Sequence, residues 1–209
     1  AVMRHPIPGS CLQLSKFVDA VVINAGDGTH EHPTQALLDM MSIKEKFGKL
    51  KGLKIAIVGD IIHSRVALSN IYGLQKMGAK ITLCGPPHLI PRGIHELGVS
   101  VNTDIDEVIE WADALNVLRI QRERMGLGLI PSIREYRAMF GITQERLDHH
   151  KKEIVIMHPG PMNRGVEIDG TVADGDQAII LNQVLHGVAS RMAILYLLCG
   201  GKFSEEDES

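Results

Sequence analysis

Short apolar segments alternate with segments of helical periodicity from residue 53 onward, and this alternation constrains the fold more than any other feature of the sequence. Strands that alternate with helices form βαβ units, whose strands lie parallel in one sheet and whose helices cover both faces. The sequence therefore predicts an α/β fold with a parallel sheet flanked by helices. The predicted strands are residues 54–60, 80–85, 99–101, 114–118 and 154–157, and the predicted helices are residues 64–77, 91–97, 104–112, 143–150 and 176–198.

The first 50 residues follow a different pattern. A short strand over 21–23 leads into the turn-rich segment 24–28, and Pro33 opens a helix that extends to Phe47. This helix would join an upstream unit to the sheet. The side chains of this helix that we expect to face inward are Leu37, Leu38, Met41 and Ile43.

Composition and charge narrow the functional classes. The net charge of -3 gives no overall basic field for nucleic acid or an anionic membrane, and no apolar run is long enough to span a membrane. The cysteines Cys11, Cys84 and Cys199 lack metal-type or redox-type spacing, which favours a reducing, cytoplasmic setting. The opening residues lack the apolar segment of a signal peptide and look like a chain entered within a domain.

Polar clusters follow three of the predicted strands at the point where each strand ends. They are residues 59–65, 119–121 and 158–161. Ligands of parallel sheets bind outside the carboxyl ends of the strands. Segments that are distant in sequence are therefore expected to converge on one crevice.

His32 and Gln35 lie at the start of the helix that Pro33 opens. A helix N-terminus carries unpaired N–H groups and the positive end of the dipole, so this pair could donate to a carbonyl oxyanion. A capping pair without chemistry is the alternative. His30, Glu31 and His32 with the nearby Asp27 could suggest a metal, but alternating residues rarely bind one ion from a helix start. We expect no metal here.

Arg65 and Arg119 each follow a predicted strand. A guanidinium fork binds two oxygens at once, which suits a carboxylate or phosphate, whereas a surface salt bridge or a solvated charged loop are the alternatives. Alternation would turn Gln121 to the same side as Arg119. The Pro- and Gly-shaped segment 158–167 offers backbone carbonyls to an amine or amide, unless it is only a stiff connector.

The order of the motifs is more specific than any one of them. The motifs are Asn-Ala-Gly-Asp-Gly at 24–28, His-Pro-Thr-Gln at 32–35, Gly-Asp-x-x-His-Ser-Arg-Val-Ala-x-Ser at 59–69, Leu-Arg-x-Gln-x-Glu-Arg at 118–124 and His-Pro-Gly-Pro-Met-Asn-Arg-Gly-Val-Glu-Ile at 158–168. Together they closely resemble the catalytic chains of the aspartate carbamoyltransferase family, over essentially the whole chain.

The resemblance implies a role for each matching residue. The implied carbamoyl phosphate site consists of Arg4, His32, Gln35, Pro159 and Gly160, of which the first three are also the implied catalytic residues. The implied aspartate site consists of Arg65, Arg119, Gln121 and Gly160. The implied reaction transfers the carbamoyl group to the α-amine of L-aspartate in pyrimidine synthesis and needs no cofactor or metal. Many family members carry Leu where Gly160 stands, which matters little for a backbone contact.

The resemblance also implies a domain organisation and an assembly. Residues 1–45 would be the end of a carbamoyl phosphate-binding domain with its linking helix, and residues 46–180 a Rossmann-like aspartate-binding domain. Residues 181–209 would be a C-terminal helix that packs back toward the first domain, with an acidic tail. Family enzymes carry a Ser-Thr-Arg-Thr loop and a mobile Ser/Lys loop upstream, so most of the first domain is expected to be missing. The family implies a homotrimer, with regulatory chains or dihydroorotase as further partners.

Three alternatives stay open. Ornithine carbamoyltransferases share the chemistry, but they have a His-Cys-Leu-Pro loop and a Cys at the position of Thr34, and their basic amine would favour acidic partners over Arg65 and Arg119. A non-catalytic aspartate-binding or assembly subunit is the second alternative. A nucleotide-binding oxidoreductase is the third, although the segment after residue 58 lacks the Gly-x-Gly-x-x-Gly fingerprint.

Overall fold

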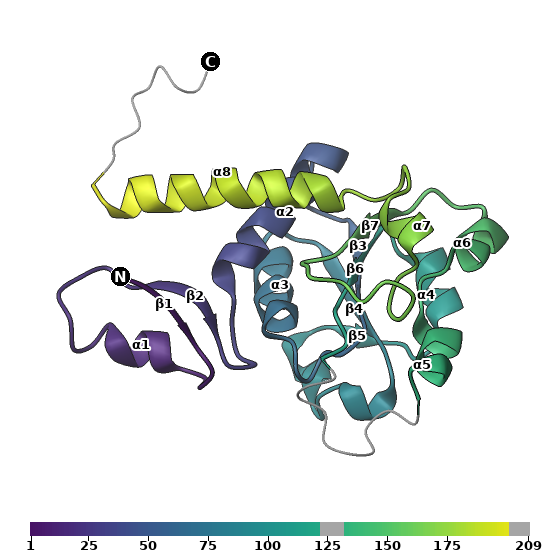
Figure 1. Ribbon diagram of the computed structural model, residues 1–209, viewed down its shortest axis with the longest axis horizontal. Helices are drawn as coiled ribbons and strands as arrows, with labels where there is room; N and C mark the ends of the chain where they lie inside the picture. The colour runs from purple at the N-terminus through teal and green to yellow at the C-terminus, as the bar shows by residue number, and fades with distance from the viewer. Residues whose placement is uncertain (122–131, 201–209) are drawn as a thin grey trace.

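The computed structural model describes residues 1–121 and 132–200 and has an α/β architecture (Figure 1). Within these residues, five parallel strands form one sheet in the order β5-β4-β3-β6-β7. The strands are β3 (Lys54–Val58), β4 (Lys80–Cys84), β5 (Ser100–Val101), β6 (Ala114–Val117) and β7 (Val155–Met157). The predicted fold class is therefore confirmed, and each predicted sheet strand is present with its ends shifted by at most two residues.

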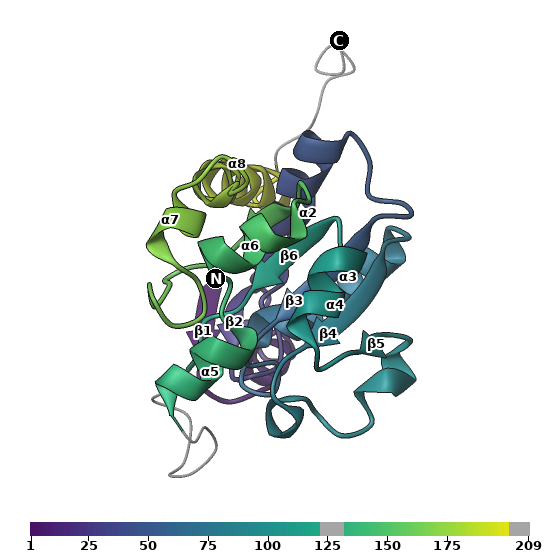
Figure 2. The same ribbon diagram turned by 90° about the vertical axis from the view of Figure 1, so that its right-hand side faces the viewer.

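Helices cover both faces of the sheet (Figure 2). The longer helices are α2 (Pro33–Phe47), α3 (Arg65–Lys76), α4 (Ile105–Trp111), α5 (Ile133–Phe140), α6 (Gln144–His150) and α8 (Ile180–Leu198). Ile55 and Ile57 of β3 pack with side chains of α2 and α3, whereas Ala56 and Val58 pack with side chains of α4, α5 and α6. Because both faces are buried, the central strand β3 is apolar after Lys54 instead of alternating.

The sheet has a switch point beside β3. The chain places β4 and β5 on one side of β3 and then returns to place β6 and β7 on the other side. The connections that leave β3 and β6 therefore diverge and open a crevice at the carboxyl ends of these strands. Gly85, directly after β4, lets the backbone that follows β3 approach closely. A Cβ on Gly85 would lie only 2.4 Å from the carbonyl oxygen of Gly59.

The N-terminal residues form a separate small unit next to the sheet domain (Figure 1). Strands β1 (Val2–His5) and β2 (Ile23–Asp27) pair in parallel, and the short helix α1 (Ser10–Leu14) connects them. Helix α2 begins shortly after β2 and packs against both α3 and α8. The predicted strand at 21–23 is observed a little later in the chain, as β2, and β1 and α1 were not predicted.

Helix α8 begins later than the sequence predicts. Residues 177–179 are instead bonded to β7, because Ile156 N–H donates to Gln177 O and Ile179 N–H donates to Ile156 O, each at 2.9 Å. The predicted helix at 91–97 is a 3-10 turn over Ile94–Leu97. Helices α5 and α7 (Gly170–Ala173) were not predicted. The predicted loop at 121–132 and the acidic tail fall mostly outside the described residues.

The buried face of α2 is more polar than predicted. Leu38 and Ile43 are buried as expected, but Leu37 and Met41 are 46% and 41% exposed, so the prediction for these two residues is wrong. Asp39 and Ser42 are buried in their place. The polar contacts of these two residues with neighbouring elements explain the exchange.

Helix α8 leaves many apolar side chains exposed. These exposed side chains include Leu181, Val184, Leu185, Val188, Met192, Leu195 and Tyr196. Even so, no helix in the described parts of the chain is long and apolar enough to cross a membrane.

Candidate active site

A cavity of about 380 Å³ lies at the switch point of the sheet. Segments from the whole length of the chain line it: the end of β1, the start of α2, the start of α3, and the segments that follow β6 and β7. The lining residues are Arg4, His32, Gln35, Ser64, Arg65, Val66, Leu118, Arg119, Gln121, Pro159, Gly160, Pro161 and Arg191.

The cavity brings together every site residue that the sequence pointed to. Arg4, His32, Gln35, Pro159 and Gly160 line it together with Arg65, Arg119 and Gln121. Arg191 of α8 lines it too and was not predicted. The sequence could have pointed to Arg191, because it is the one Lys, Arg, Asp or Glu among the residues of α8. Arg191 itself is exposed, so a solvated surface charge is the other interpretation of this signal.

His32 is held as the N-cap residue of α2 by its backbone, because its N–H donates to the Ser69 hydroxyl of α3 at 2.8 Å. Burial lowers the pKa of His32 to about 4, and the positive charges of Arg4, Arg191 and Arg65 contribute to this shift. The imidazole is therefore neutral at pH 7. The Thr34 hydroxyl lies 3.4 Å from Nδ1, so a proton donated there would leave the ring N–H on Nε2.

Arg65 is the first residue of α3, directly after the N-cap residue Ser64, whose hydroxyl accepts a hydrogen bond from Ala67 N–H at 3.3 Å. Its side chain passes over Gly26. A Cβ on Gly26 would lie 2.8 Å from Arg65 Nη1, and Gly26 also has a φ of +117°. The glycine of the Asn-Ala-Gly-Asp-Gly motif is thus required both by the backbone and by the space that Arg65 occupies.

Gln121 and the segment before α3 are fixed to one another. The Gln121 amide Nε2 donates to the carbonyl oxygen of His63 at 3.0 Å. His63 Nδ1 in turn lies 2.8 Å from the buried carboxylate of Asp60, which follows β3. These contacts fix the polar segment that follows β3 relative to the polar segment that follows β6.

The loop after β7 is held by buried contacts of its own. His158 N–H donates to Gln183 Oε1 at 2.9 Å, and Gly160 N–H donates to His158 Nδ1 at 2.9 Å. With Nδ1 as acceptor, the ring proton of His158 is on Nε2, which lies 3.4 Å from Glu167. The Gly160–Pro161 peptide bond is cis, and Gly160 has a φ of +65°.

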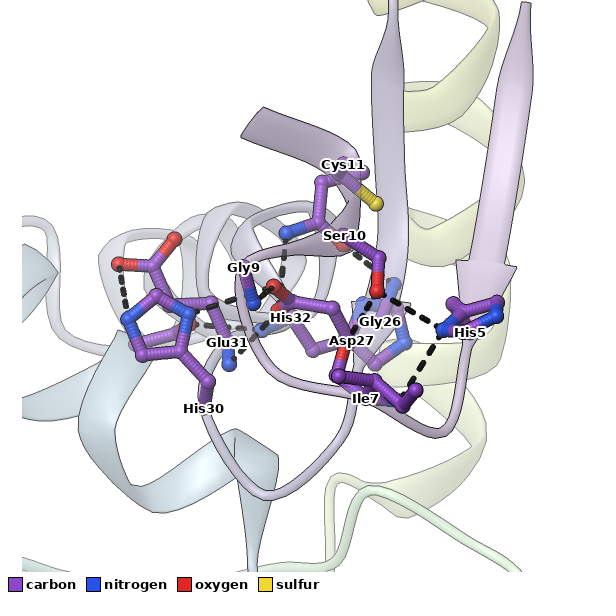
Figure 3. A network of polar contacts seen from close by, with 12 residues as sticks. His5, Ile7, Gly9, Ser10, Cys11, Gly26, Asp27, His30, Glu31 and His32 are labelled. Carbon is purple, nitrogen blue, oxygen red and sulfur yellow. Dashed lines mark hydrogen bonds and ion pairs between the residues drawn. The ribbon is translucent and has the colours of Figure 1, made fainter. Parts of the chain in front are cut away.

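Asp27 organises the turn that leads from β2 to His32 (Figure 3). Its carboxylate accepts hydrogen bonds from the backbone N–H groups of Gly9 at 2.7 Å and Glu31 at 3.1 Å, and His30 Nδ1 lies at 3.3 Å. Burial raises the pKa of Asp27, but these contacts and the Asn24 amide outweigh burial and hold it below its usual value. Asp27 and His30 are not among the cavity-lining residues. Within residues 1–121 and 132–200, no cluster of His, Cys, Asp or Glu suits a metal ion.

A second, wider hollow of about 660 Å³ lies between α5 and α6. Two of its three arginines already have acidic partners, because Arg137 pairs with Asp169 and Arg146 Nε lies 2.9 Å from Asp106. The cavity at the switch point is the better candidate, since arginines from four separate segments converge on it.

The arrangement suits a ligand with several negative groups. Among the described residues, the guanidinium groups of Arg4, Arg65, Arg119 and Arg191 line the cavity, so it is strongly positive although the whole chain has a net charge of -3. A neutral imidazole and a carboxamide lie beside them as donors and acceptors. Such a site can hold carboxylates and phosphate and can stabilise charge that develops on a carbonyl oxygen.

Two family models match the chain. The model of the aspartate/ornithine carbamoyltransferase Asp/Orn binding domain matches residues 51–198, and that of the carbamoyl-P binding domain matches residues 1–45. The second match does not support the expectation that most of the first domain is missing, because a match says nothing about what lies outside it.

Individual proteins agree with the family models. The aspartate carbamoyltransferase catalytic subunit of Gemmatimonas aurantiaca is 57% identical over 96% of this chain and 63% of its own length. Aspartate transcarbamoylase from Trypanosoma cruzi, in complex with N-(phosphonacetyl)-L-aspartic acid, matches with a TM-score of 0.82 at 32% identity over 93% of this chain and 64% of that one. Ornithine carbamoyltransferase from Pyrococcus furiosus matches with a TM-score of 0.80 at 26% identity over 96% and 67%.

The chain spans less than two thirds of the length of the first curated relatives that it matches. The family model of the Asp/Orn binding domain nevertheless covers well over half of the chain, from residue 51 to residue 198. The chain therefore belongs to the aspartate/ornithine carbamoyltransferase family.

Proposed function

We propose that this chain binds carbamoyl phosphate and L-aspartate and transfers the carbamoyl group to the aspartate α-amine, giving N-carbamoyl-L-aspartate and phosphate for pyrimidine synthesis. The observation that carries the proposal is the convergence of four arginines, His32 and Gln35 on one cavity. Aspartate carbamoyltransferases at 56% to 59% identity support the choice of substrates.

The cavity residues divide between the two substrates. Arg65 and Arg119 are proposed to bind the two carboxylates of aspartate, because a guanidinium fork matches a carboxylate, and Gln121 supports this half of the site. The remaining half is proposed to bind carbamoyl phosphate. It consists of Arg4, His32, Gln35 and the backbone of Pro159 and Gly160.

The proposed reaction is a direct displacement at the carbamoyl carbon. The neutral α-amine attacks this carbon, a C–N bond forms, and the carbonyl oxygen becomes an oxyanion. Arg4 and the neutral His32 would donate hydrogen bonds to that oxygen. The C–O bond to phosphate then breaks, and the departing phosphate takes the surplus amine proton and leaves as HPO₄²⁻. Holding both substrates in one cavity supplies much of the remaining acceleration.

The finer organisation is also a proposal. We propose residues 1–45 as part of the carbamoyl phosphate-binding domain, residues 46–180 as the aspartate-binding domain and residues 181–209 as the C-terminal segment. The limits of the two family models support the first boundary. A homotrimer with regulatory chains or dihydroorotase as further partners, and a cytoplasmic location, are proposed from the family resemblance and from the free cysteines.

The test measures product formation from radiolabelled carbamoyl phosphate with L-aspartate or L-ornithine as the amine. N-carbamoyl-L-aspartate from aspartate alone supports the proposal, whereas citrulline from ornithine contradicts it. Calorimetric titration with aspartate is carried out in parallel. Aspartate binding without product would favour a non-catalytic aspartate-binding subunit. The absence of both aspartate binding and product would reject the proposal.

A matched pair of variants ties the result to the cavity. Arg65→Gln removes one proposed carboxylate ligand and should weaken aspartate binding by about tenfold to a hundredfold, the loss of a charge-assisted hydrogen bond. Arg92→Gln removes the same charge from an exposed position away from the cavity and should leave aspartate binding unchanged.

A further inference from the structure

Asp39 is a buried carboxylate that the proposed reaction does not use. It lies on α2 one turn after Gln35, is 0% exposed, and is not among the residues that line the cavity. Burying a carboxylate is costly unless hydrogen bonds replace its water. An acidic side chain at such a position therefore needs a reason, and its partners supply one.

Four neutral amides from four elements donate to Asp39. Oδ1 accepts from Gln35 Nε2 at 3.0 Å and from Gln183 Nε2 at 2.8 Å. Oδ2 accepts from Asn70 Nδ2 at 2.8 Å and from Asn116 Nδ2 at 3.3 Å. Burial raises the pKa of Asp39, and the four donors oppose the rise. The contacts join α2, α3, β6 and α8, and Figure 1 shows α2 beside both α3 and α8.

The first consequence concerns Gln35, which lines the cavity. A carboxamide has a donor end and an acceptor end, and the two are exchanged by a rotation of its plane. Because Gln35 Nε2 is bonded to Asp39, its Oε1 is the end that stays available as an acceptor. Asp39 thus makes Gln35 suited to an N–H group of a ligand, such as the amide of a carbamoyl donor, rather than to an oxyanion.

The second consequence concerns the loop after β7. Gln183 donates to Asp39 with Nε2 and accepts from His158 N–H with Oε1. His158 Nδ1 then accepts from Gly160 N–H, and Gly160 lines the cavity. A continuous chain of hydrogen bonds therefore runs from Asp39 to Gly160 in the wall of the cavity.

We propose that Asp39 is a positioning residue that fixes the acceptor end of Gln35 toward the carbamoyl donor and, through Gln183, fixes the Gly160 loop relative to it. Asp39 itself touches no substrate. The proposal rests on the proposed function for the identity of the ligand, but the positioning of Gln35 and Gly160 is a property of the free protein.

Three variants separate positioning from simple stability. Asp39→Asn replaces one accepting oxygen with an amide N–H₂ group, which faces the N–H donors that surround position 39. This variant should displace the side chain of Gln35 or Gln183. The double variant Asp39→Asn/Asn70→Asp exchanges the carboxylate and the carboxamide between two neighbouring positions, which keeps the charge and the number of atoms. Ser42→Ala removes a buried hydroxyl from the same helix without touching Asp39 or the cavity, and it is the control for lost stability.

The first measurement is a ¹⁵N-edited NMR spectrum of each free protein, which reports on the Gln35 side-chain amide and the Gly160 backbone amide. Both resonances should shift in Asp39→Asn, return toward their original positions in the double variant and stay in place in Ser42→Ala. Unchanged resonances in Asp39→Asn, or equal shifts in Ser42→Ala, would overturn the proposal.

The second measurement is carbamoyl phosphate binding by calorimetry. We expect the dissociation constant to rise about tenfold in Asp39→Asn, to recover in the double variant and to stay unchanged in Ser42→Ala. If the unsubstituted chain binds no carbamoyl phosphate, the proposed function fails, and the NMR comparison still decides the positioning role.

Gln183→Met keeps the test decisive if Asp39→Asn does not fold. Met has a similar volume but no amide, so this variant cuts only the arm that leads to His158. The Gly160 resonance should shift while the Gln35 side-chain resonance stays in place. A shift of both, or of neither, would contradict a chain of contacts through Gln183.

Discussion

Gly26 shows how a single residue without a side chain can position a charged one. Its Cβ would lie 2.8 Å from Nη1 and 2.9 Å from Cδ of Arg65. Gly26→Ala should therefore displace the Arg65 guanidinium and weaken aspartate binding about tenfold, in addition to a backbone strain of about 1–2 kcal/mol. Calorimetric titration with aspartate measures the first effect and urea unfolding the second.

Gly52→Ala is the matched control for Gly26→Ala. Gly52 also has a positive φ, +82°, but nothing lies within 4 Å of the Cβ that a substitution would add. It should lose a similar amount of stability and keep its affinity for aspartate. Equal loss of affinity in both variants would mean that strain, and not the contact with Arg65, limits binding.

His32 makes the stability of the protein depend on pH. Its pKa is about 4 when folded, below the value of about 6.5 in an unfolded chain, so the unfolded state binds the proton first as the pH falls. Stability should therefore decrease between pH 6.5 and pH 4, by at most about 3 kcal/mol from this residue. His32→Gln should remove this part of the acid sensitivity in urea unfolding at pH 7 and pH 4.5.

The control for His32 is His95→Gln, which removes an exposed imidazole. It should leave the pH dependence of unfolding unchanged. NMR titration of the His32 ring measures its pKa directly, and a midpoint near 6.5 would contradict the account.

Polar residues at strand ends and helix starts were predictable, because their positions follow from the chain order alone. Arg65, Arg119 and His32 are of this kind. Asp39 was not predictable, since a carboxylate within a helix is normally solvated and only the approach of α3, β6 and α8 supplies its donors. Arg191 lies within the long apolar helix α8, where the packing of whole elements decides which side chains reach the cavity.

At the scale of elements, a buried histidine joins α8 to α2 at a point outside the cavity. His186 of α8 is 5% exposed, its Nδ1 lies 2.8 Å from the Ser42 hydroxyl, and its Nε2 pairs with Glu45. His186→Ala should lower the free energy of unfolding by about 2–3 kcal/mol, because packing and hydrogen bonds are lost together. Urea unfolding measures the loss, and faster hydrogen exchange in α8 would localise it.

Leu181→Ala on the same helix is the comparison for His186→Ala. Leu181 is 82% exposed, so its truncation should change the free energy of unfolding by less than about 0.5 kcal/mol. A loss as large as that of His186→Ala would show that the stability lost in His186→Ala does not come from its buried contacts.

The elements that the sequence predicted correctly are those with a strong local pattern. Strands β3 and β4 are mainly apolar runs followed by Gly, and α3 has a Ser N-cap with regular apolar spacing. The start of α8 was misplaced because residues 176–179 look helical in isolation. Their backbone groups bond to Ile156 of β7, a contact that depends on the folded sheet and not on the local sequence.

At the scale of the whole molecule, the cavity concentrates positive charge in a protein of net charge -3. Arg4 lies near one end of the described chain and Arg191 near the other, so only the complete fold brings these charges together. Electrostatic attraction between exposed charges is screened by salt, whereas buried pairs are screened much less. We expect the affinity for inorganic phosphate to fall as the salt concentration rises, because ions in this open cavity are reached by solvent.

Arg191→Gln tests this convergence directly. Arg191 is one of the charges that lower the pKa of His32, so its removal should raise that pKa, since a protonated imidazole is then repelled less. Phosphate affinity should fall and its dependence on salt should become weaker, because one attracting charge is lost. NMR titration of His32 and phosphate calorimetry at two salt concentrations measure these effects.

Arg92→Gln removes an exposed charge elsewhere and should change neither the His32 pKa nor the phosphate affinity. An unchanged His32 pKa in Arg191→Gln would mean that the charge of Arg191 on α8 does not act on His32 in the cavity.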